Sequence, residues 1–166
     1  MRVGIGYDIH PLAAGRKLIL GGVEVPHTRG LAGHSDADAL VHAVCDAILG
    51  ALGEGDLGRH YPSSDPRYKD ISSLQLLEDV ARLLGTKGWR LANLDAVIMA
   101  QAPRLSPHLP DMQARLAEVL QIDRKIVNIK VKSGEGLDAI GKEQAIAAQA
   151  ICLLEESGSR KVKTSS

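Results

Sequence analysis

The stretch from Gly33 to Ile48 constrains the fold more than any other part of the sequence. Read at 3.6 residues per turn, it is apolar on nearly every side and predicts a largely buried helix. Ser35 or Asp36 is the predicted N-cap, and Ser35 with Asp38 approximates a capping box. We therefore expect the rest of the chain to pack around this helix.

A narrow polar stripe interrupts the apolar surface of the predicted helix. Asp38, His42 and Asp46 follow one another at four-residue intervals, which places them on one face. One interpretation is that this face meets water. The other is that it faces a metal ion or an anionic ligand, because unpaired buried polar groups cost several kcal/mol.

Composition limits the class of protein. The length of 166 residues fits one domain with its own core. The formal net charge is zero, which argues against nucleic acid as the main partner, because binding to phosphate backbones requires a basic surface. Aromatic residues make up 2% of the chain, so the core must be built from Leu, Ile, Val and Ala.

The cysteines and the hydropathy pattern indicate a cytoplasmic protein. Cys45 and Cys152 lie in apolar runs that read as helical, and we expect them to be small core residues in a reducing compartment. The N-terminus runs into a predicted strand without a signal region. No segment approaches the length of apolar sequence that a membrane helix needs.

Residues 2–10 predict a strand in which Gly4 and Gly6 mark a close approach of another backbone segment. Asp8 and His10 are two residues apart, so both side chains point to the same face of an extended strand. They are either solvated polar residues at a strand end or two ligands of a metal site.

The remaining elements alternate between strands and helices. Gly21-Gly22 is a hairpin signal between short strands at 17–20 and 23–26. Further strands are predicted over 91–100 and 126–132, helices over 72–84, 112–120 and 143–156, and loops over 53–70, 101–110 and 133–142. This order predicts a single α+β domain over 1–156 with α/β-like interleaving, a mixed sheet covered by helices on one side, and a disordered tail over 157–166.

Asp8, His10 and His42 together offer one carboxylate and two imidazoles, with no fourth protein ligand evident. Three ligands and one open position are typical of a catalytic zinc site. A ligating histidine commonly donates its other N–H to a carboxylate, and Asp46, one turn after His42, is a candidate. Asp38 and Asp46 are thus interpreted as supporting groups behind the ligands, or as helix-capping or salt-bridging residues.

Several motifs carry a family resemblance: Gly-Tyr-Asp-Ile-His at 6–10, the run over 34–47, Gly-Asp-Leu-Gly at 55–58, Tyr-Pro-Ser-Ser-Asp-Pro at 61–66 and Ala-Gln-Ala-Pro-Arg-Leu at 100–105. Together they closely resemble the 2-C-methyl-D-erythritol 2,4-cyclodiphosphate synthases, over residue 1 to about residue 155. The resemblance implies an enzyme of the non-mevalonate isoprenoid pathway. It would convert 4-diphosphocytidyl-2-C-methyl-D-erythritol 2-phosphate to the 2,4-cyclodiphosphate and CMP.

The resemblance also implies a homotrimer with active sites between neighbouring subunits, which uses Zn²⁺ and a second divalent cation, Mg²⁺ or Mn²⁺. Carried over to this chain, Glu135 holds the second ion, and His34 and Ser133 stabilise the transition state. The implied zinc ligands are Asp8, His10 and His42. The implied substrate-binding residues are Asp8, His10, His34, Ser35, Asp56, Leu57, Gly58, Tyr61, Ser63, Asp65, Ala100, Arg104, Leu105, Ser106, Lys132, Ser133, Gly134, Glu135 and Lys142.

The residue inventory agrees with this chemistry. The nucleophile would be the substrate's own phosphate, whose second pKa of roughly 6 makes a strong protein base unnecessary. Such a phosphoryl transfer needs alignment and charge neutralisation. We also expect His34 to lie just ahead of a helix N-terminus, where backbone N–H groups favour an anion.

The loop over 132–142 departs most from the family pattern. Ser133 keeps a hydroxyl and Glu135 keeps the carboxylate. Ala139 and Lys142 replace an aromatic residue and an arginine associated with the family's central trimer cavity. Lysine lacks the bidentate fork of arginine, so we expect weaker capture of an isoprenoid diphosphate there.

Two alternatives use the same three ligands. A zinc-dependent phosphohydrolase would direct water at the phosphate and release inorganic phosphate. A non-enzymatic trimeric scaffold would hold zinc structurally, but a closed structural site needs a fourth protein ligand and no cysteine is suitably placed.

Overall fold

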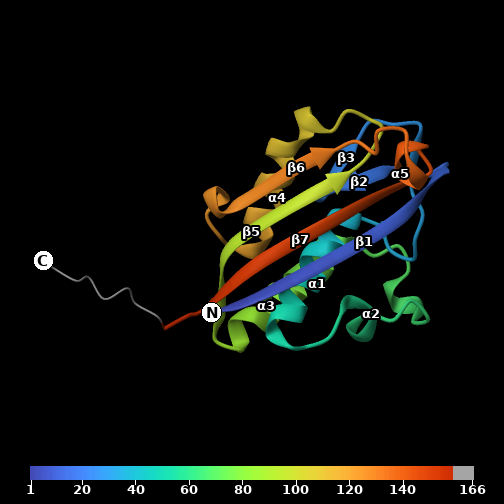
Figure 1. Ribbon diagram of the computed structural model, residues 1–166. Coiled ribbons are helices and arrows are strands. Elements are labelled where there is room, and N and C mark those ends of the chain that lie inside the picture. Colours follow the sequence, from blue (N-terminus) through green and yellow to red (C-terminus); the bar gives the residue numbers. More distant parts are fainter. Residues whose placement is uncertain (159–166) are drawn as a thin grey trace, which may run out of the picture.

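The structure is a computed structural model that describes residues 1–158, and a five-stranded mixed sheet forms its centre (Figure 1). The strand order is β4-β1-β7-β5-β6. β7 runs antiparallel to both β1 and β5, whereas β5 and β6 are parallel. The strands are β1 (Arg2–Ala14), β4 (Arg29–Leu31), β5 (Trp89–Met99), β6 (Val127–Lys132) and β7 (Ala145–Glu156).

Three long helices lie on one face of this sheet (Figure 1). They are α1 (Ala39–Leu52), α3 (Ser73–Thr86) and α4 (Leu109–Leu120). The shorter elements are α2 (Leu57–His60), α5 (Asp138–Gly141) and the 3₁₀ turns η1 (Pro66–Tyr68), η2 (Ser106–His108) and η3 (Arg124–Ile126). The predicted single α+β domain with helices on one side of a mixed sheet is confirmed.

The hairpin predicted around Gly21-Gly22 is present, with β2 (Leu18–Leu20) antiparallel to β3 (Val23–Val25). Both glycines have positive φ, as a two-residue hairpin turn requires. The hairpin is fixed to α1 because the backbone N–H groups of Gly21 and Gly22 both donate to the Asp38 carboxylate.

α1 begins later than the sequence indicates. Its N-cap is Asp38, which is fully buried and accepts a hydrogen bond from the backbone N–H of Val41. The predicted caps, Ser35 and Asp36, are wrong because their side chains are used elsewhere. Ser35 Oγ accepts from the N–H of Ala37, and the Asp36 carboxylate accepts from the first residue of α3.

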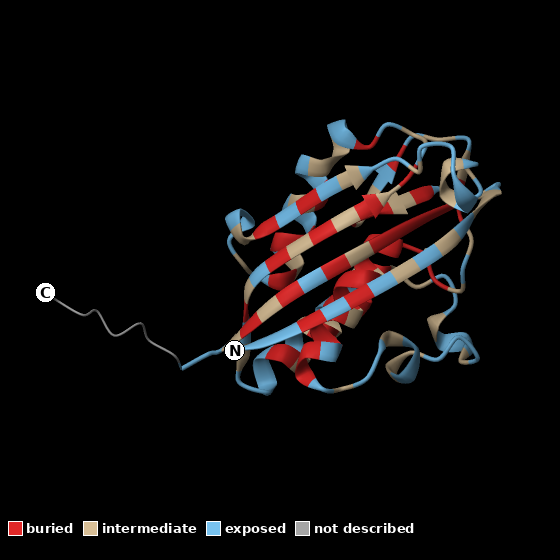
Figure 2. Ribbon diagram, in the orientation of Figure 1, coloured by how far each residue is buried: buried red, intermediate tan, exposed pale blue. Residues whose placement is uncertain are grey.

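The close approach predicted at Gly4 and Gly6 is confirmed. A Cβ added at Gly6 would lie 1.9 Å from the carbonyl oxygen of Ala43, and one at Gly4 would lie 1.8 Å from that of Ala47. The backbone of β1 therefore packs directly on the backbone of α1. Even-numbered residues of β1 face α1, while the odd-numbered ones face away from it, and Figure 2 shows this alternation in burial.

The helix predicted over 143–156 is wrong, because this segment is strand β7. Alanine favours helices, but here the segment pairs with β1 on one side and β5 on the other. The residues at alternate positions, Ile146, Ala148, Ala150, Cys152 and Leu154, are buried on the α1 face. Cys152 is thus a buried strand residue, whereas Cys45 lies in α1 as predicted.

Several boundaries differ from the predictions. β1 continues to Ala14, α3 passes Gly85 and ends at Thr86, and α4 begins at Leu109. The predicted loop over 53–70 contains α2 and η1. The predicted tail over 157–166 lies outside the described residues except for Ser157 and Gly158. None of the helices within residues 1–158 is long and apolar enough to cross a bilayer.

Candidate metal centre

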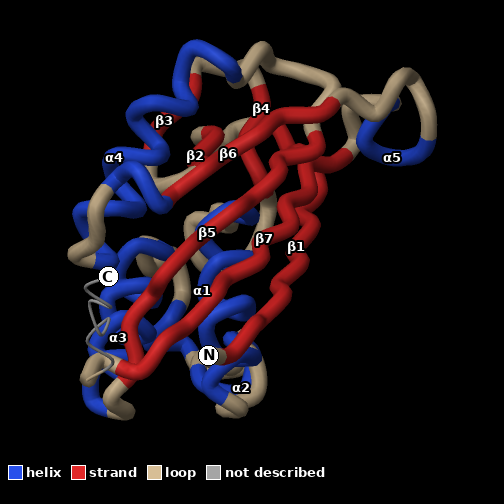
Figure 3. Tube along the Cα trace, turned by 60° about the vertical axis from the view of Figure 1, so that its left-hand side comes forward, coloured by secondary structure: helices blue, strands red, loops and turns tan. Residues whose placement is uncertain are grey.

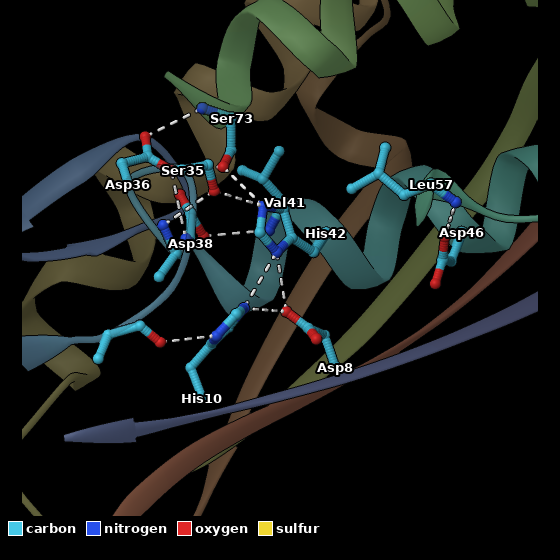
Figure 4. Close-up of polar contacts among 12 residues, drawn as sticks. Asp8, His10, Ser35, Asp36, Asp38, Val41, His42, Asp46, Leu57 and Ser73 are labelled. Atoms are coloured by element: carbon cyan, nitrogen blue, oxygen red, sulfur yellow. Dashed lines mark hydrogen bonds and ion pairs between the residues drawn. The ribbon is translucent and has the colours of Figure 1, made fainter. Parts of the chain in front are cut away.

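Asp8, His10 and His42 converge at the junction of β1 and α1 (Figure 4). Asp8 and His10 are even-numbered residues of β1 and therefore point toward α1, where His42 lies in the first turn. Asp8 Oδ2 is 2.8 Å from His10 Nε2 and 2.9 Å from His42 Nδ1, and these two nitrogens are 3.2 Å apart. The predicted set of three donors is thus brought together by two elements.

The hydrogen bonds behind the histidines show that this donor set fits a cation. His10 Nδ1 is 3.0 Å from the carbonyl oxygen of Ala32, which can only accept, so Nδ1 carries a proton and the Nε2 lone pair faces Asp8. His42 Nε2 is 2.9 Å from Ser73 Oγ on the side away from Asp8. A carboxylate oxygen and two imidazole nitrogens therefore point at a common centre, and a shared cation satisfies all three.

The charges at this centre shift the pKa values of both β1 ligands. Burial opposes ionisation of Asp8, but the hydrogen bonds and charges of His10 and His42 outweigh it and hold the pKa of Asp8 well below its usual range. Burial also opposes protonation of His10, but the Asp8 carboxylate outweighs it and raises the pKa of His10 above 6.5. The centre is therefore strongly cation-attracting at neutral pH.

Sequence reasoning missed two residues behind His42. Ser73, the first residue of α3, is fully buried, and its hydroxyl lies between His42 and the Asp36 carboxylate (Figure 4). Asp36 accepts hydrogen bonds from both the hydroxyl and the backbone N–H of Ser73. No spacing rule pairs His42 with a serine on another helix, so only the folded chain reveals this contact.

The two aspartates of the polar stripe have separate places. Asp46 accepts from the backbone N–H of Leu57 at 2.7 Å and so fixes the start of α2, and its predicted bond to His42 is not formed. Burial raises the pKa of Asp46, while the bond from Leu57 opposes that rise. Asp38 caps α1 and anchors the β2–β3 hairpin.

A pocket of about 420 Å³ opens over the three donors. Of the residues predicted to bind substrate, those that line it are Asp8, His10, His34, Ser35, Leu57, Gly58, Tyr61 and Ser63. A larger groove of about 600 Å³ lies between α3 and α4, but its described lining contains no histidine or cysteine. The smaller pocket is therefore the better candidate for the site.

Two residues predicted to bind substrate, Asp56 and Asp65, are not among the described residues that line this pocket. Asp56 accepts from the N–H of Arg59 and caps α2. The Asp65 carboxylate binds Arg67, and the backbone carbonyl of Asp65 lies 3.1 Å from His34 Nε2. The carboxylate of Asp38 accepts from the N–H of Val41, so it uses one of the N–H groups at the N-terminus of α1 that we expect to favour an anion beside His34.

A second group of predicted residues lies outside this pocket within residues 1–158. Its residues lie at the ends of the parallel strands β5 and β6 and in the segments that follow them, and the two strand ends are adjacent because the N–H of Ala100 donates to the carbonyl of Lys132. Ser133 Oγ donates to the Glu135 carboxylate in the exposed loop that leads to α5. Figure 3 shows α5 at the upper end of the sheet, apart from α2. The residues of this group are Ala100, Arg104, Leu105, Ser106, Lys132, Ser133, Gly134, Glu135 and Lys142.

Comparisons with known proteins agree with this geometry. The sequence matches the YgbB family over residues 1–155. It is 53% identical over 156 residues to the 2-C-methyl-D-erythritol 2,4-cyclodiphosphate synthase of Syntrophomonas wolfei, which covers 94% of this chain and 99% of that protein.

Solved structures agree as well. A 2C-methyl-D-erythritol-2,4-cyclodiphosphate synthase superimposes with a TM-score of 0.86 at 34% identity, over 93% of this chain and 100% of the other. The CDP complex of IspF from Plasmodium falciparum gives a TM-score of 0.84 at 32% identity, over 95% of this chain and 97% of that one. The chain belongs to the YgbB family, the family of the 2-C-methyl-D-erythritol 2,4-cyclodiphosphate synthases.

Proposed function

We propose that the chain converts 4-diphosphocytidyl-2-C-methyl-D-erythritol 2-phosphate to 2-C-methyl-D-erythritol 2,4-cyclodiphosphate with release of CMP. The observation that carries this function is the convergence of Asp8, His10 and His42 at the base of a pocket. The names of the relatives support the same reaction in isoprenoid precursor synthesis. The thiols of Cys45 and Cys152 are both free, which fits a cytoplasmic enzyme.

The metal ions have distinct places in this proposal. Zn²⁺ would be held by Asp8, His10 and His42, because two imidazoles and one carboxylate are typical ligands of zinc. Glu135 holds a second divalent cation, Mg²⁺ or Mn²⁺, which prefer oxygen ligands. When bound, such cations neutralise and align the phosphates of the substrate.

The protein's own groups orient the substrate around these sites. The carbonyl of Asp65 accepts from His34 Nε2, so His34 can donate from Nδ1 to a phosphoryl oxygen when both of its ring nitrogens are protonated. The hydroxyl of Tyr61 donates to Asp79, which fixes the loop that forms one wall of the pocket. Ser133 offers a hydroxyl beside Glu135. The attacking group is the substrate's own phosphate, so these residues position it and need not remove a proton.

We place the complete active site between subunits of a homotrimer. In one chain the residues around Glu135 do not line the pocket that contains His42, among the residues described. The helix-free face of the sheet carries an apolar stripe whose side chains are between 43% and 67% exposed. The stripe consists of Val3, Ile5, Tyr7 and Ile9 on β1 and Ile151 on β7. An exposed apolar stripe of this kind is typical of a protein–protein interface, so a neighbouring chain can bring its Glu135 group to this pocket.

The reaction is tested by incubating the purified protein with the diphosphocytidyl substrate and Mg²⁺ and following the products by phosphorus NMR. We expect a cyclic diphosphate and CMP in equal amounts. Replacement of His42 by Ala should abolish both zinc retention and CMP release, because it removes one of three ligands.

The products separate this function from the alternative. Release of inorganic phosphate without a cyclic product would identify a phosphohydrolase at the same ligands. Undiminished CMP release by the His42→Ala variant would contradict the role of this centre.

A further inference from the structure

The N-terminus of α3 contacts the side of the His42 ring that faces away from Asp8. Ser73 is completely buried, and its hydroxyl is 2.9 Å from His42 Nε2 on the side away from Asp8. The Asp36 carboxylate receives both the hydroxyl and the backbone N–H of Ser73. A carboxylate, a hydroxyl and an imidazole thus form a continuous chain of hydrogen bonds that ends at a metal ligand (Figure 4).

Asp36 fixes the direction of this chain. An ionised carboxylate can only accept hydrogen bonds, so the single hydroxyl proton of Ser73 is donated to Asp36. The remaining lone pairs of Ser73 Oγ can then only accept, and the atom they face is His42 Nε2. His42 must therefore carry its proton on Nε2, which leaves the Nδ1 lone pair directed at Asp8 and the metal position.

Ser35 does not impose this direction by itself. Its Oγ lies 3.2 Å from His42 Nε2 and accepts from the N–H of Ala37. No carboxylate among the described residues takes the proton of this hydroxyl, so Ser35 can either donate to His42 or accept from it. Only the Asp36–Ser73 pair excludes the wrong tautomer.

We propose that Ser73 and Asp36 are positioning residues of the metal centre, which hold His42 in the tautomer that binds zinc and make its Nδ1 a better ligand. This role rests on the proposed zinc site. Partners behind a ligating histidine typically change metal affinity by roughly 10- to 100-fold. Asp36 also binds the first backbone N–H of α3, so the same carboxylate connects the metal centre to the helix that flanks the pocket.

Asp36→Asn is the sharpest test because it should reverse the chain while keeping its shape. Asp36 accepts from the backbone N–H of Ser73 at 3.0 Å on one oxygen and from that of Asp38 at 3.3 Å on the other. The shorter bond favours the Asn rotamer whose oxygen faces the N–H of Ser73 and whose NH₂ faces Ser73 Oγ. The serine would then donate to His42 Nε2 and place the ring proton on Nδ1, where zinc has to bind. Ser73→Ala removes the chain without reversing it.

Ser72→Ala is the matched control. Ser72 is the neighbouring serine and the N-cap of α3, yet its side chain makes no capping hydrogen bond. The variant removes the same hydroxyl group one residue away, and thermal unfolding of all variants confirms that each is folded at the temperature of the binding experiment.

Zinc affinity is measured by competition with a chelator, and the protonation of each ring nitrogen of His42 by long-range ¹⁵N–¹H NMR of the zinc-loaded and zinc-free protein. We expect zinc to bind roughly 10- to 100-fold more weakly to Ser73→Ala and Asp36→Asn, and with wild-type affinity to Ser72→Ala. In the NMR experiment we expect the His42 proton on Nδ1 only in zinc-free Asp36→Asn.

Two outcomes would overturn the proposal. Wild-type affinity in both Ser73→Ala and Asp36→Asn, with the proton still on Nε2, would remove the positioning role and leave the zinc site intact. Zinc binding that His42→Ala does not weaken would remove the zinc site itself, and the positioning role with it.

Discussion

At the scale of single residues, His10 determines how the metal centre responds to pH. Burial opposes its protonation, but the adjacent Asp8 carboxylate outweighs burial and raises the pKa of His10 above 6.5. Zinc needs the Nε2 lone pair, so a proton on His10 competes with the metal as the pH falls through that raised pKa. We expect the apparent zinc affinity to fall by roughly tenfold per pH unit below it, as measured by chelator competition.

Asp8→Asn is the control for this pH dependence. The variant removes the charge that raises the pKa of His10, so the fall in affinity should begin at a lower pH, although binding is weaker throughout. The Asp8 carboxylate itself stays ionised across this range, because its pKa is held well below its usual value. A zinc affinity that stays constant from about pH 8 to about pH 5.5 would contradict this account.

The sequence predicted the ligands but not the residues behind them. Asp8 and His10 are two apart in a strand and His42 lies on a recognisable helix, so periodicity places each side chain on a definite face. Ser73 reaches His42 from another helix, and Asp36 reaches Ser73 from an irregular turn. Such contacts depend on how elements pack against each other, which a local pattern does not encode.

At the scale of elements, the contact between β1 and α1 sets the geometry of the metal centre. A Cβ at position 6 would lie 1.9 Å from the carbonyl oxygen of Ala43 and 2.7 Å from the N of Ala47, and neither backbone atom can rotate away. Gly6→Ala should therefore push α1 from β1 and lower the free energy of unfolding by about 1–3 kcal/mol or more. Denaturant unfolding measures the loss, and zinc affinity should fall with it because His42 moves with α1.

Gly50→Ala provides the comparison on the same helix. A Cβ at this exposed position would come no closer than 3.9 Å to the carbonyl oxygen of Ile5, an ordinary contact. The substitution should leave stability unchanged or raise it by up to about 1 kcal/mol through helix propensity. If Gly6→Ala were as stable as Gly50→Ala, the close packing of the two backbones would not be a structural requirement.

Element types were predictable wherever one face of a segment differs clearly from the other. The β2–β3 hairpin, α3 and β6 meet that condition, and each was predicted within a few residues. β7 does not, because it lies between two strands and carries apolar residues on both faces, including exposed Ile151. Its alanines fit the helical period as well as the strand period, and pairing with β1 and β5 decided the outcome.

At the scale of the whole molecule, the chain presents two groups of candidate site residues that one copy does not unite. The pocket over His42 and the loop that carries Glu135 are built by different elements, and the described lining of the pocket includes no residue from that loop. The sequence motifs identified both groups but could not give their separation, because relative placement depends on the packed sheet. In the proposed trimer, a neighbouring chain would complete each site.

Ile5→Glu tests that assembly. Ile5 lies at the centre of the exposed apolar stripe and is 60% exposed in the single chain, so a charge there costs the isolated subunit little. In a trimer built on this face the carboxylate would be buried without a partner, which opposes association. Light scattering after gel filtration should show a trimer for the wild type and smaller species for the variant, whereas Ala114→Glu on the exposed surface of α4 should remain trimeric.

Zinc affinity should persist in the Ile5→Glu subunit while CMP release is lost, because all three proposed zinc ligands come from one chain and Glu135 would come from another. A monomeric wild type with full activity would contradict both the trimer and the shared site.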